Sequence, residues 1–342
     1  MLLLATFTAL PGCGAGYLLQ AARGEREVLA RRRPIEVVVA DPATSPAVRD
    51  TLKEVGAARD FASRELGLPD NRSYRLYADL GRPYVVWNVV AAPEFSTTPR
   101  QWCFLVAGCV EYRGYFKQSA AREYAAGLAA RGDDTVVEGV PAYSTLGHFA
   151  DPVLNTMLGY GPRELAAMIF HELAHQLLYV AGDSRFNEAF ATAVEEEGLR
   201  RWLAARGEPQ QMRLHEQRQA QERKFAALLR AAREDLQALY AQPLAVEPMR
   251  ERKRARLARL ADDIRSLDRH PDNTSGPGVY DAWLAEGLNN ARLAAVATYE
   301  DCVPGFQQLL AREGGDLRRF YTAARTLSKL SASERDASVC GG

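Results

Sequence analysis

The run Ile169-Phe170-His171-Glu172-Leu173-Ala174-His175-Gln176 decides how the rest of the chain is interpreted. Side chains four residues apart on a helix lie one above the other, so His171 and His175 point the same way and can hold one metal ion. Zinc accepts neutral imidazole, and a catalytic zinc site needs a third protein ligand and an open position for water. Glu172, beside the first histidine, would face that water as a general base. The run predicts one Zn²⁺ bound by His171 and His175, with Glu172 as a catalytic residue.

The flanks of this run favour a buried site. Ala166-Ala167-Met168 precedes it and Leu177-Leu178-Tyr179-Val180 follows, so the helix is apolar nearly all round. Burying two imidazoles and a carboxylate without partners is unfavourable, and a metal ion with its water satisfies all three groups. The alternative, a chance pattern of polar residues on a solvated helix, is disfavoured by these flanks.

The segment Phe186-Asn187-Glu188-Ala189-Phe190-Ala191 supplies the third ligand in this interpretation. A short loop around Gly182 separates the two helices, and such a helical hairpin turns Glu188 back toward the histidines. The competing acids at 195–197 are consecutive, spread around most of a helical turn and are expected on a solvated face.

Two neighbours of Glu188 are predicted to support the metal ligands from behind. Thr192 lies one turn after Glu188, and Asn187 directly precedes it. Metal-binding histidines usually donate their second ring N–H to an outer partner, for which a carboxylate is stronger than a hydroxyl.

The two segments together resemble those of the gluzincins, zinc peptidases that bind the metal with two histidines and a glutamate. In the thermolysin-type and aminopeptidase-type enzymes the glutamate lies in an N-E-x-x-x segment, which residues 187–191 match after a shorter spacer. Nearly the whole chain is similar to a bacterial family of predicted zinc aminopeptidases identified as lipoproteins. Besides the metal segments, this similarity is carried by Trp102-Cys103-Phe104 through Tyr115-Phe116, by Ala142-Tyr143-Ser144-Thr145-Leu146-Gly147 and by Leu288-Asn289-Asn290-Ala291.

The resemblance implies a zincin-like fold, one zinc ion and peptidase activity. The aminopeptidase label is itself a prediction within that family. The G-x-M-E-N segment of the best-known gluzincin aminopeptidases is absent, and Glu138 and Glu111 are both candidates for holding a substrate ammonium group.

Composition and charge limit the class of partner. The chain has 342 residues, of which 47% are hydrophobic and 25% charged, enough for a large core in one large domain or two small ones. Lys plus Arg and Asp plus Glu both number 43, so no overall charge favours nucleic acid. The basic cluster over 250–259 contains acids and no interleaved aromatic residues, and is expected to be a solvated face.

The first residues have the character of a signal peptide. The run from Leu2 to Leu10 is apolar but too short to span a bilayer, and Leu10-Pro11-Gly12-Cys13 resembles the lipobox of bacterial lipoproteins. A buried N-terminal strand is the alternative. We expect residues 1–13 to be a signal peptide with lipidated Cys13, placing the protein on the periplasmic side of the cell envelope, anchored to the outer membrane.

Four cysteines remain once Cys13 is set aside, and three pairings of them are possible. In an exported protein a disulfide is expected, and Cys103 with Cys109 is our prediction for one bridge, closing a tight turn at Gly108. Buried free thiols are the alternative.

The remaining chain is predicted to be α+β and mostly α, with a small mixed sheet. Residues 14–160 form an N-terminal α/β part, 161–207 the zinc-binding helix pair, 208–270 a long helical hairpin and 271–342 a helical closing segment. The expected helices lie over 14–33, 46–66, 117–131, 210–240, 250–267, 280–300, 303–313 and 317–330, and the expected strands over 74–77, 84–90 and 135–140, with a frayed tail to 342.

Substrate is expected to add as a strand beside the metal helix. The strands over 74–90, or the segment 143–149, are predicted to supply the edge to which it binds. An oxyanion donor is expected from a downstream helix, with Tyr299 as our prediction and Tyr280, Asn289 and Asn290 as alternatives.

The predicted activity is zinc-dependent peptide hydrolysis by an aminopeptidase acting on peptides in the bacterial cell envelope. Glu172 takes the proton of the attacking water and passes it to the leaving amine. An endopeptidase or peptidoglycan-peptide hydrolase would use the same chemistry. A non-catalytic envelope scaffold, in which zinc only staples two helices, is the alternative from another class.

Overall fold

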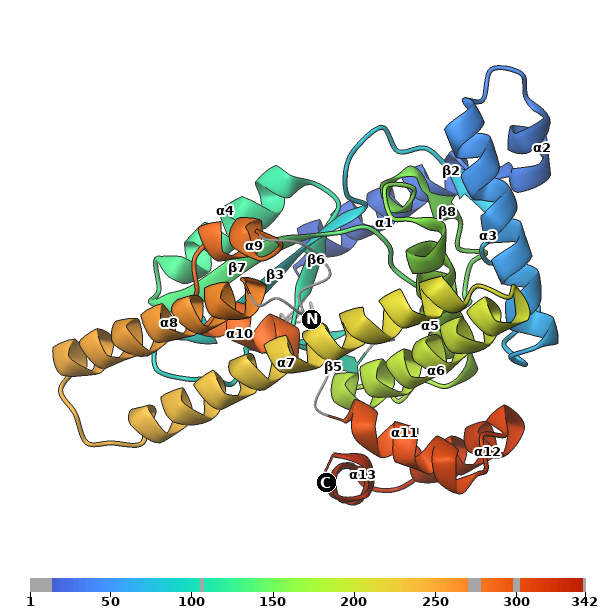
Figure 1. Ribbon diagram of the computed structural model, residues 1–342. Coiled ribbons are helices and arrows are strands. Elements are labelled where there is room, and N and C mark those ends of the chain that lie inside the picture. The colour runs from blue at the N-terminus through green and yellow to red at the C-terminus, as the bar shows by residue number, and fades with distance from the viewer. Residues whose placement is uncertain (1–13, 105–107, 270–277, 298–301, 341–342) are drawn as a thin grey trace, which may run out of the picture.

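The computed structural model describes residues 14–104, 108–269, 278–297 and 302–340. The fold is α+β and mostly helical, which confirms the predicted fold class, and Figure 1 shows the order of its elements. The helices are α1 (Ala15–Ala30), α2 (Ile35–Ala40), α3 (Pro46–Arg64), α4 (Gln118–Ala129), the 3-10 helix η1 (Asn155–Met157), α5 (Pro162–Leu177), α6 (Ser184–Ala205), α7 (Pro209–Tyr240), α8 (Val246–Asp268), α9 (Asp281–Ala285), α10 (Asn290–Ala297), α11 (Val303–Arg312), α12 (Leu317–Leu327) and α13 (Ala332–Val339). The strands are β1 (Arg33–Pro34), β2 (Leu76–Ala78), β3 (Val86–Pro93), β4 (Trp102–Phe104), β5 (Gly108–Val110), β6 (Arg113–Tyr115), β7 (Asp133–Val140) and β8 (Val153–Leu154).

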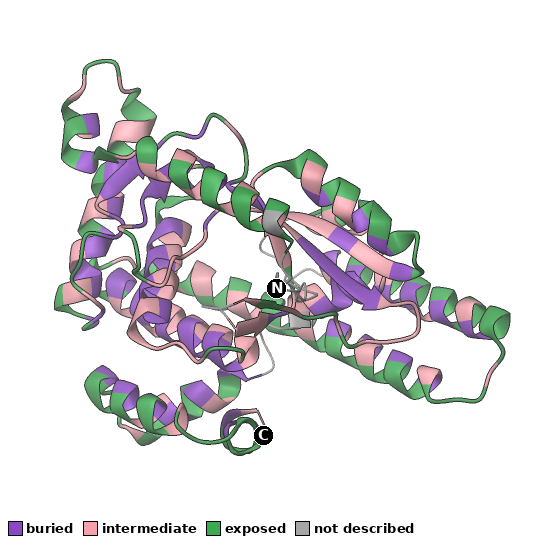
Figure 2. Cartoon of the chain, turned by 180° about the vertical axis from the view of Figure 1, so that it is seen from behind, coloured by how far each residue is buried: buried purple, intermediate pink, exposed green. Residues whose placement is uncertain are grey.

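The strands form three small sheets within the described residues. The central sheet has the order β6-β3-β7 with antiparallel neighbours. Strands β1, β2 and β8 form a second sheet, and β4 pairs with β5 in a hairpin. Because the small sheets lie between helices, most of the core is contributed by helical residues, as the distribution of buried residues in Figure 2 shows.

Strand β3 contacts different elements on its two faces, because its successive side chains point in opposite directions. On one face, Trp87 and Val89 pack against α4. On the other face, Val90 packs against α10, whereas Val86 and Asn88 line a cavity in front of α5. The sheet is therefore covered by helices except where it meets this cavity.

Helices α5 and α6 lie side by side in the largest cluster of buried residues (Figure 1). Pro162 begins α5 at a position where a missing backbone N–H does no harm. Gly198 of α6 permits a close approach to α5, because a Cβ atom there would lie 2.9 Å from a ring carbon of Phe170. Phe170 directly precedes the first histidine, so this contact fixes α6 beside the predicted metal site.

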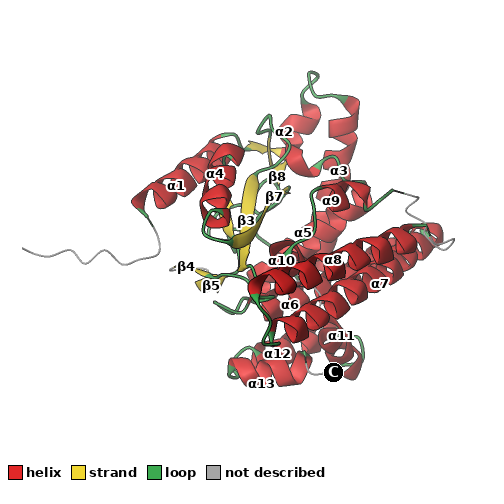
Figure 3. Ribbon diagram, turned by 90° about the vertical axis from the view of Figure 1, so that its left-hand side faces the viewer, coloured by secondary structure: helices red, strands yellow, loops and turns green. Residues whose placement is uncertain are grey.

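The long hairpin of α7 and α8 runs along one side of the molecule (Figures 1 and 3). Lys253 joins α8 to the end of the central sheet, since its Nζ donates to Asp134 Oδ2 at 2.6 Å and to the Glu94 carbonyl at 2.9 Å. Arg250 also binds the Glu94 carboxylate. The predicted solvated face is therefore wrong for Lys253, which is buried, whereas the Arg250 side chain is 41% exposed and pairs with Glu94 at the surface.

Two predictions about the C-terminal part are corrected by the structure. The single helix predicted over 280–300 is divided into α9 and α10, because Gly287 between them has a positive φ of 85°. The tail predicted to fray forms α13, in which Val339 is buried, and a disulfide joins Cys340 to Cys302.

A second disulfide joins Cys103 to Cys109 across β4 and β5. Among the described helices, none is both long enough and apolar enough to cross a membrane.

Candidate metal centre

The loop between α5 and α6 leads into a helix that presents Glu188 at the start of its second turn. The Asp183 side chain caps this helix by accepting from the Phe186 N–H at 3.1 Å. Asn187 is buried and clamps the loop, because its Oδ1 accepts from the Val180 N–H at 2.7 Å and its Nδ2 donates to the Val180 carbonyl at 2.8 Å. Asn187 thus fixes the backbone of the loop that leads to Glu188.

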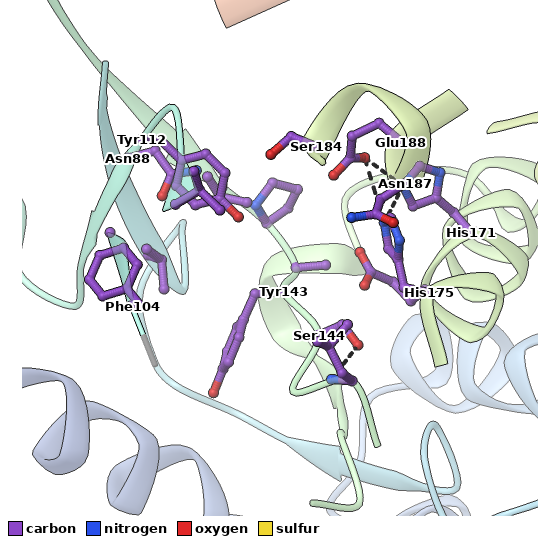
Figure 4. A pocket seen from close by; sticks show the side chains of 18 of the residues that line it. Asn88, Phe104, Tyr112, Tyr143, Ser144, His171, His175, Ser184, Asn187 and Glu188 are labelled. Atoms are coloured by element: carbon purple, nitrogen blue, oxygen red, sulfur yellow. Dashed lines mark hydrogen bonds and ion pairs between the residues drawn. The ribbon is translucent and has the colours of Figure 1, made fainter. Parts of the chain in front are cut away.

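Three possible ligand atoms converge where the sequence places a metal. His171 Nε2 lies 3.1 Å from His175 Nε2 and 3.2 Å from Glu188 Oε2. His175 Nε2 lies 3.5 Å from the same carboxylate oxygen. Figure 4 shows the three side chains pointing toward one another on the side of the cavity formed by α5 and α6.

The charges of these groups are strongly coupled. Burial alone would raise the pKa of Glu188, but its hydrogen bonds with His171 and His175 outweigh that effect and hold the pKa well below its usual range. Burial likewise opposes ionisation of His171, but Glu188 and Glu195 raise its pKa well above the ordinary value. These two shifts favour an ionised Glu188 carboxylate with positive charge next to it, on the side of the histidine rings.

Glu195 is the supporting residue that the sequence analysis misplaced. Its Oε2 lies 2.9 Å from His171 Nδ1, a distance at which an imidazole N–H donates to a carboxylate. The predicted solvated face is therefore wrong for Glu195, which follows Glu188 by two helical turns and so shares its side of α6. Within the described residues, no hydrogen bond joins Thr192 to either histidine. The spacing of seven residues could have identified Glu195.

The other two acids of the run are also engaged. Glu196 accepts from Gln307 of α11 at 2.5 Å, and Glu197 binds Arg200 and Arg201 at 2.7 Å each. The Glu196 contact ties α6 to α11, whereas the Glu197 ion pairs lie within α6 itself.

Glu172 lies beside the converging ligand atoms and lines the cavity. Burial raises the pKa of its carboxyl group, while the nearby His175 and His171 act in the opposite direction. A carboxylate whose pKa is raised toward neutrality is suited to accept a proton and release it again.

The cavity in front of these residues has a volume of about 740 Å³, within the range of about 300–1,000 Å³ typical of ligand sites. Its helical wall consists of α5 and the start of α6. The opposite wall is mostly apolar and is formed by the sheet, the segment after β7 and helix α1. The residues of that opposite wall include Tyr17, Ala21, Val86, Phe104, Val110, Tyr112, Phe116, Val140, Pro141, Ala142 and Tyr143.

The segment after β7 passes along the cavity and ends in a turn. Leu146 has a positive φ of 56°, which is uncommon for a residue other than glycine, and its N–H donates to Ser144 Oγ at 3.1 Å. Asp151 accepts from the Thr145 N–H at 3.1 Å and from Thr145 Oγ1 at 2.7 Å. Gln176 of α5 donates to the same carboxylate at 3.4 Å. This network joins the segment to the helix that carries the histidines.

The backbone of 142–144 is available to a ligand. Among the described residues, no hydrogen bond is made by the backbone N–H or C=O groups of this stretch. By contrast, the outer edge of β6 is covered, since Gln20 of α1 binds the Gly114 carbonyl at 3.3 Å and the Phe116 N–H at 3.2 Å. Of the segments named in the sequence analysis, β3 also borders the cavity but is paired on both sides, by β6 and β7. Among the described residues, the segment beginning at Tyr143 is therefore the one that borders the cavity with unpaired backbone groups.

The predicted oxyanion donors do not gather at the site. Tyr299 lies outside the described residues. Tyr280 stacks on Phe225 in a separate cluster, and Asn289 and Asn290 bind the backbone of the sheet. These three predictions are not supported by position, because the helix that carries the asparagines packs on the far part of the sheet.

Two other tyrosines line the same cavity as the possible ligand atoms. Tyr112 and Tyr179 line the cavity, and desolvation together with the negative charge of Glu188 raises the pKa of both phenols. Figure 4 shows Tyr112 across the cavity from Glu188. The aromatic run that contains Tyr112 indicated a cleft, but nothing in the sequence connected it with the metal residues.

Neither acid considered for a substrate ammonium group lines the cavity. Glu138 lies near Arg292, with 3.6 Å between Oε1 and Nη1, and Glu111 is likewise not among the lining residues. Helix α1 instead brings Glu25 to the cavity wall. No sequence motif marks Glu25.

A family model with the description "Putative aminopeptidase" matches residues 16–339, which is nearly the full length of the chain. No curated protein and no solved structure gives a significant match.

Proposed function

Since the chain belongs to the putative aminopeptidase family and is on that ground a peptidase, we propose that it hydrolyses peptide bonds with one zinc ion held by His171, His175 and Glu188. The observation that carries the proposal is the convergence of three ligand atoms at the edge of a large cavity. The proposed substrate is a peptide, and the proposed place of action is the bacterial cell envelope.

The spacing of the three atoms fits a zinc ion. Two ligand atoms bound at the usual zinc distances and at a tetrahedral angle lie about 3.4 Å apart. The observed separations of 3.1, 3.2 and 3.5 Å are close to that value. Two histidines and one glutamate are also a ligand set that zinc takes in hydrolytic enzymes, and His171 would release its ring proton on binding the ion.

A zinc ion in this position would supply Lewis-acid activation of the scissile carbonyl and of a water molecule. Glu172 then acts as the proton carrier of the reaction. Its carboxylate accepts a proton from the attacking water and returns it to the amine that leaves when the C–N bond breaks. Glu195 holds the ring of His171 in one orientation, which restricts the ligand to the productive geometry.

The opposite side of the cavity positions the substrate in this proposal. The free backbone groups of 142–144 bind the extended peptide as an added strand. The hydroxyl groups of Tyr112 and Tyr179 are the candidates to donate to the developing oxyanion, since both phenols remain protonated at neutral pH.

The proposal also includes aminopeptidase action and a lipid anchor. Aminopeptidase action requires recognition of a free substrate amine, whereas an endopeptidase accepts blocked peptides. Anchoring of the chain through a lipid on Cys13 would place the cavity at a membrane surface, and Cys13 lies outside the described residues. Matched peptides with free and acetylated amino termini separate the first two activities.

The test is hydrolysis of a peptide library by zinc-loaded protein and by Glu172→Gln. The proposal predicts hydrolysis by the parent and zinc retention without hydrolysis by the variant. Glu164→Gln, on the first turn of the same helix and bound to Arg163 and Arg218, is the control and should retain activity. Zinc binding without hydrolysis of any peptide by the parent would favour the structural scaffold instead.

A further inference from the structure

Two glutamates on α1 differ in how their charge is balanced. Glu27 forms ion pairs with Arg31 at 3.0 Å and with Arg82 at 2.9 Å. Glu25, two residues earlier and on the cavity side, has no ion pair with any described residue, and its carboxylate accepts a hydrogen bond from the Tyr143 hydroxyl. The helix therefore places one carboxylate without a counter-charge on the wall of the cavity.

The Tyr143 contact also locates Glu25 along the cavity. Figure 4 shows the Tyr143 ring directed away from His171 and His175, with its hydroxyl at the far end. Because that hydroxyl binds Glu25, the carboxylate lies at the end of the cavity remote from the converging histidines. The Glu25 carboxylate thus lies beyond the Tyr143 ring, on the side away from the histidines.

Helix α1 is firmly attached at this position. Gln20 binds the backbone of Gly114 and Phe116, as described above, and the ring of Phe116 packs against Gly24 so closely that a Cβ there would lie 2.0 Å from the ring. Glu25 directly follows this contact. Its carboxylate is consequently held in place by a rigid helix before any ligand binds, which reduces the entropy lost on binding.

The surroundings of Glu25 favour a cation. The wall between Glu25 and the metal site includes Val86, Val140 and Phe116, which offer no charge to the carboxylate. A half-buried carboxylate in apolar surroundings is costly unless an opposite charge or hydrogen bonds compensate it. The Tyr143 hydroxyl supplies one hydrogen bond but no charge.

We propose that Glu25 binds a cationic group of the substrate at a fixed distance from the scissile bond, and so determines specificity. The inference rests on the proposed peptidase function. The cation is an ammonium or guanidinium group, which can belong to the free amino terminus of a short peptide or to a lysine or arginine side chain. The apolar walls bind the uncharged atoms that lie between this cation and the bond to be cleaved.

The test measures peptide binding by calorimetry to the zinc-loaded full chain carrying Glu172→Gln, so that the probes are not consumed. The probes are alanine and leucine tetrapeptides with a free or an acetylated amino terminus. A second acetylated pair carries lysine or its uncharged isostere norleucine at each position in turn. The free-amine probe and the lysine probes distinguish the two sources of the cation.

Adding Glu25→Gln should weaken the binding of at least one cationic probe by about 10- to 100-fold, the range expected when one charge-assisted hydrogen bond is lost. Binding of its neutral partner should change less than about twofold. Glu25→Asp, which keeps the charge, should restore part of the selectivity. Glu27→Gln on the same helix is the matched control, and unfolding temperatures of all variants report on the fold.

Three results would overturn the inference. They are equal binding of charged and neutral probes by the parent, equal weakening of both by Glu25→Gln, and the same loss in Glu27→Gln. Failure of the proposed function is distinguishable, because it appears as an absence of hydrolysis by the zinc-loaded chain with intact Glu172. Hydrolysis without charge selectivity removes only the role of Glu25.

Discussion

On the helical wall of the cavity, ionisable side chains of α5 and α6 are bonded to one another. The wall built from the sheet and α1 is mostly apolar and carries one carboxylate, that of Glu25, which has no ion pair with any described residue. Buried charges that compensate each other are expensive to rearrange and suit a fixed reaction centre. An apolar wall with one charge discriminates between ligands by shape and sign. We infer that the helical wall holds the metal and carries the proton, and that the apolar part of the sheet wall, apart from the proposed oxyanion donor Tyr112, selects the substrate.

The largest effect is expected on the helical wall. Glu172→Gln removes the proton acceptor but keeps the size of the side chain, so kcat should fall by about 10²- to 10⁴-fold, the usual cost of removing a proton carrier. The Michaelis constant and the zinc content should stay within a few-fold of the parent. Steady-state kinetics and elemental analysis measure these quantities. Substantial retained activity would exclude Glu172 from the mechanism.

Asp151, which connects the segment after β7 to α5, should make the free energy of unfolding depend on pH. Burial raises the pKa of Asp151 from 3.8 to about 6. The folded state therefore binds this proton more tightly than the unfolded state, so the contribution of Asp151 to stability is greatest below pH 4 and declines as the pH rises to about 6. Asp151→Asn does not titrate.

Relative to Asp151→Asn, the parent should lose up to about 3 kcal/mol of unfolding free energy between pH 4 and pH 7, as a shift of about two pKa units implies. Urea unfolding of both proteins across this range measures the difference. A difference that does not change with pH, or that grows in favour of the parent as the pH rises, contradicts the burial of Asp151 described here.

A smaller effect is expected from the residue that supports the metal ligand. Glu195→Gln leaves His171 with a weaker acceptor, and loss of such outer partners typically costs about 10–100-fold in metal affinity or activity. Competition with a chelator measures the zinc affinity. Thr192→Val, on the same helix, is the control and should leave the affinity unchanged. Equal behaviour of the two variants would remove the role of Glu195.

The smallest effect is expected from the apolar part of the sheet wall. Val140→Phe adds bulk to the cavity, and the Michaelis constant for peptides with large side chains should rise by about tenfold, the usual effect of small changes in an apolar pocket. The rate constant kcat should change little. A fall in kcat without a change in the Michaelis constant would show that this wall takes part in the chemistry, against the division of roles inferred above.

The two walls also differ in how far their residues could be predicted from the sequence. His171, His175 and Glu188 lie within 17 residues of one another on two consecutive helices, so helical periodicity predicts that they meet. Glu195 obeys the same periodicity, but its place in a run of three acids suggested a solvated surface. The helical wall could therefore be predicted almost completely from local spacing.

The sheet wall could not be predicted in this way. Glu25 and Tyr143 are separated by 118 residues, and only the packing of α1 across the edge of the sheet brings them together. Tyr112 reaches the cavity from the segment between β5 and β6, far in sequence from Glu188. Such contacts depend on tertiary structure, for which the sequence offered an aromatic run and no periodic pattern.

The most direct test of the proposed metal centre is X-ray diffraction from crystals of the zinc-loaded protein, with anomalous data on both sides of the zinc absorption edge. The account predicts one anomalous peak, about 2.0–2.2 Å from Nε2 of His171, Nε2 of His175 and a carboxylate oxygen of Glu188, with Glu172 beside it and unbound to the metal. A peak elsewhere, or a fully loaded protein with no peak between these three side chains, would contradict it.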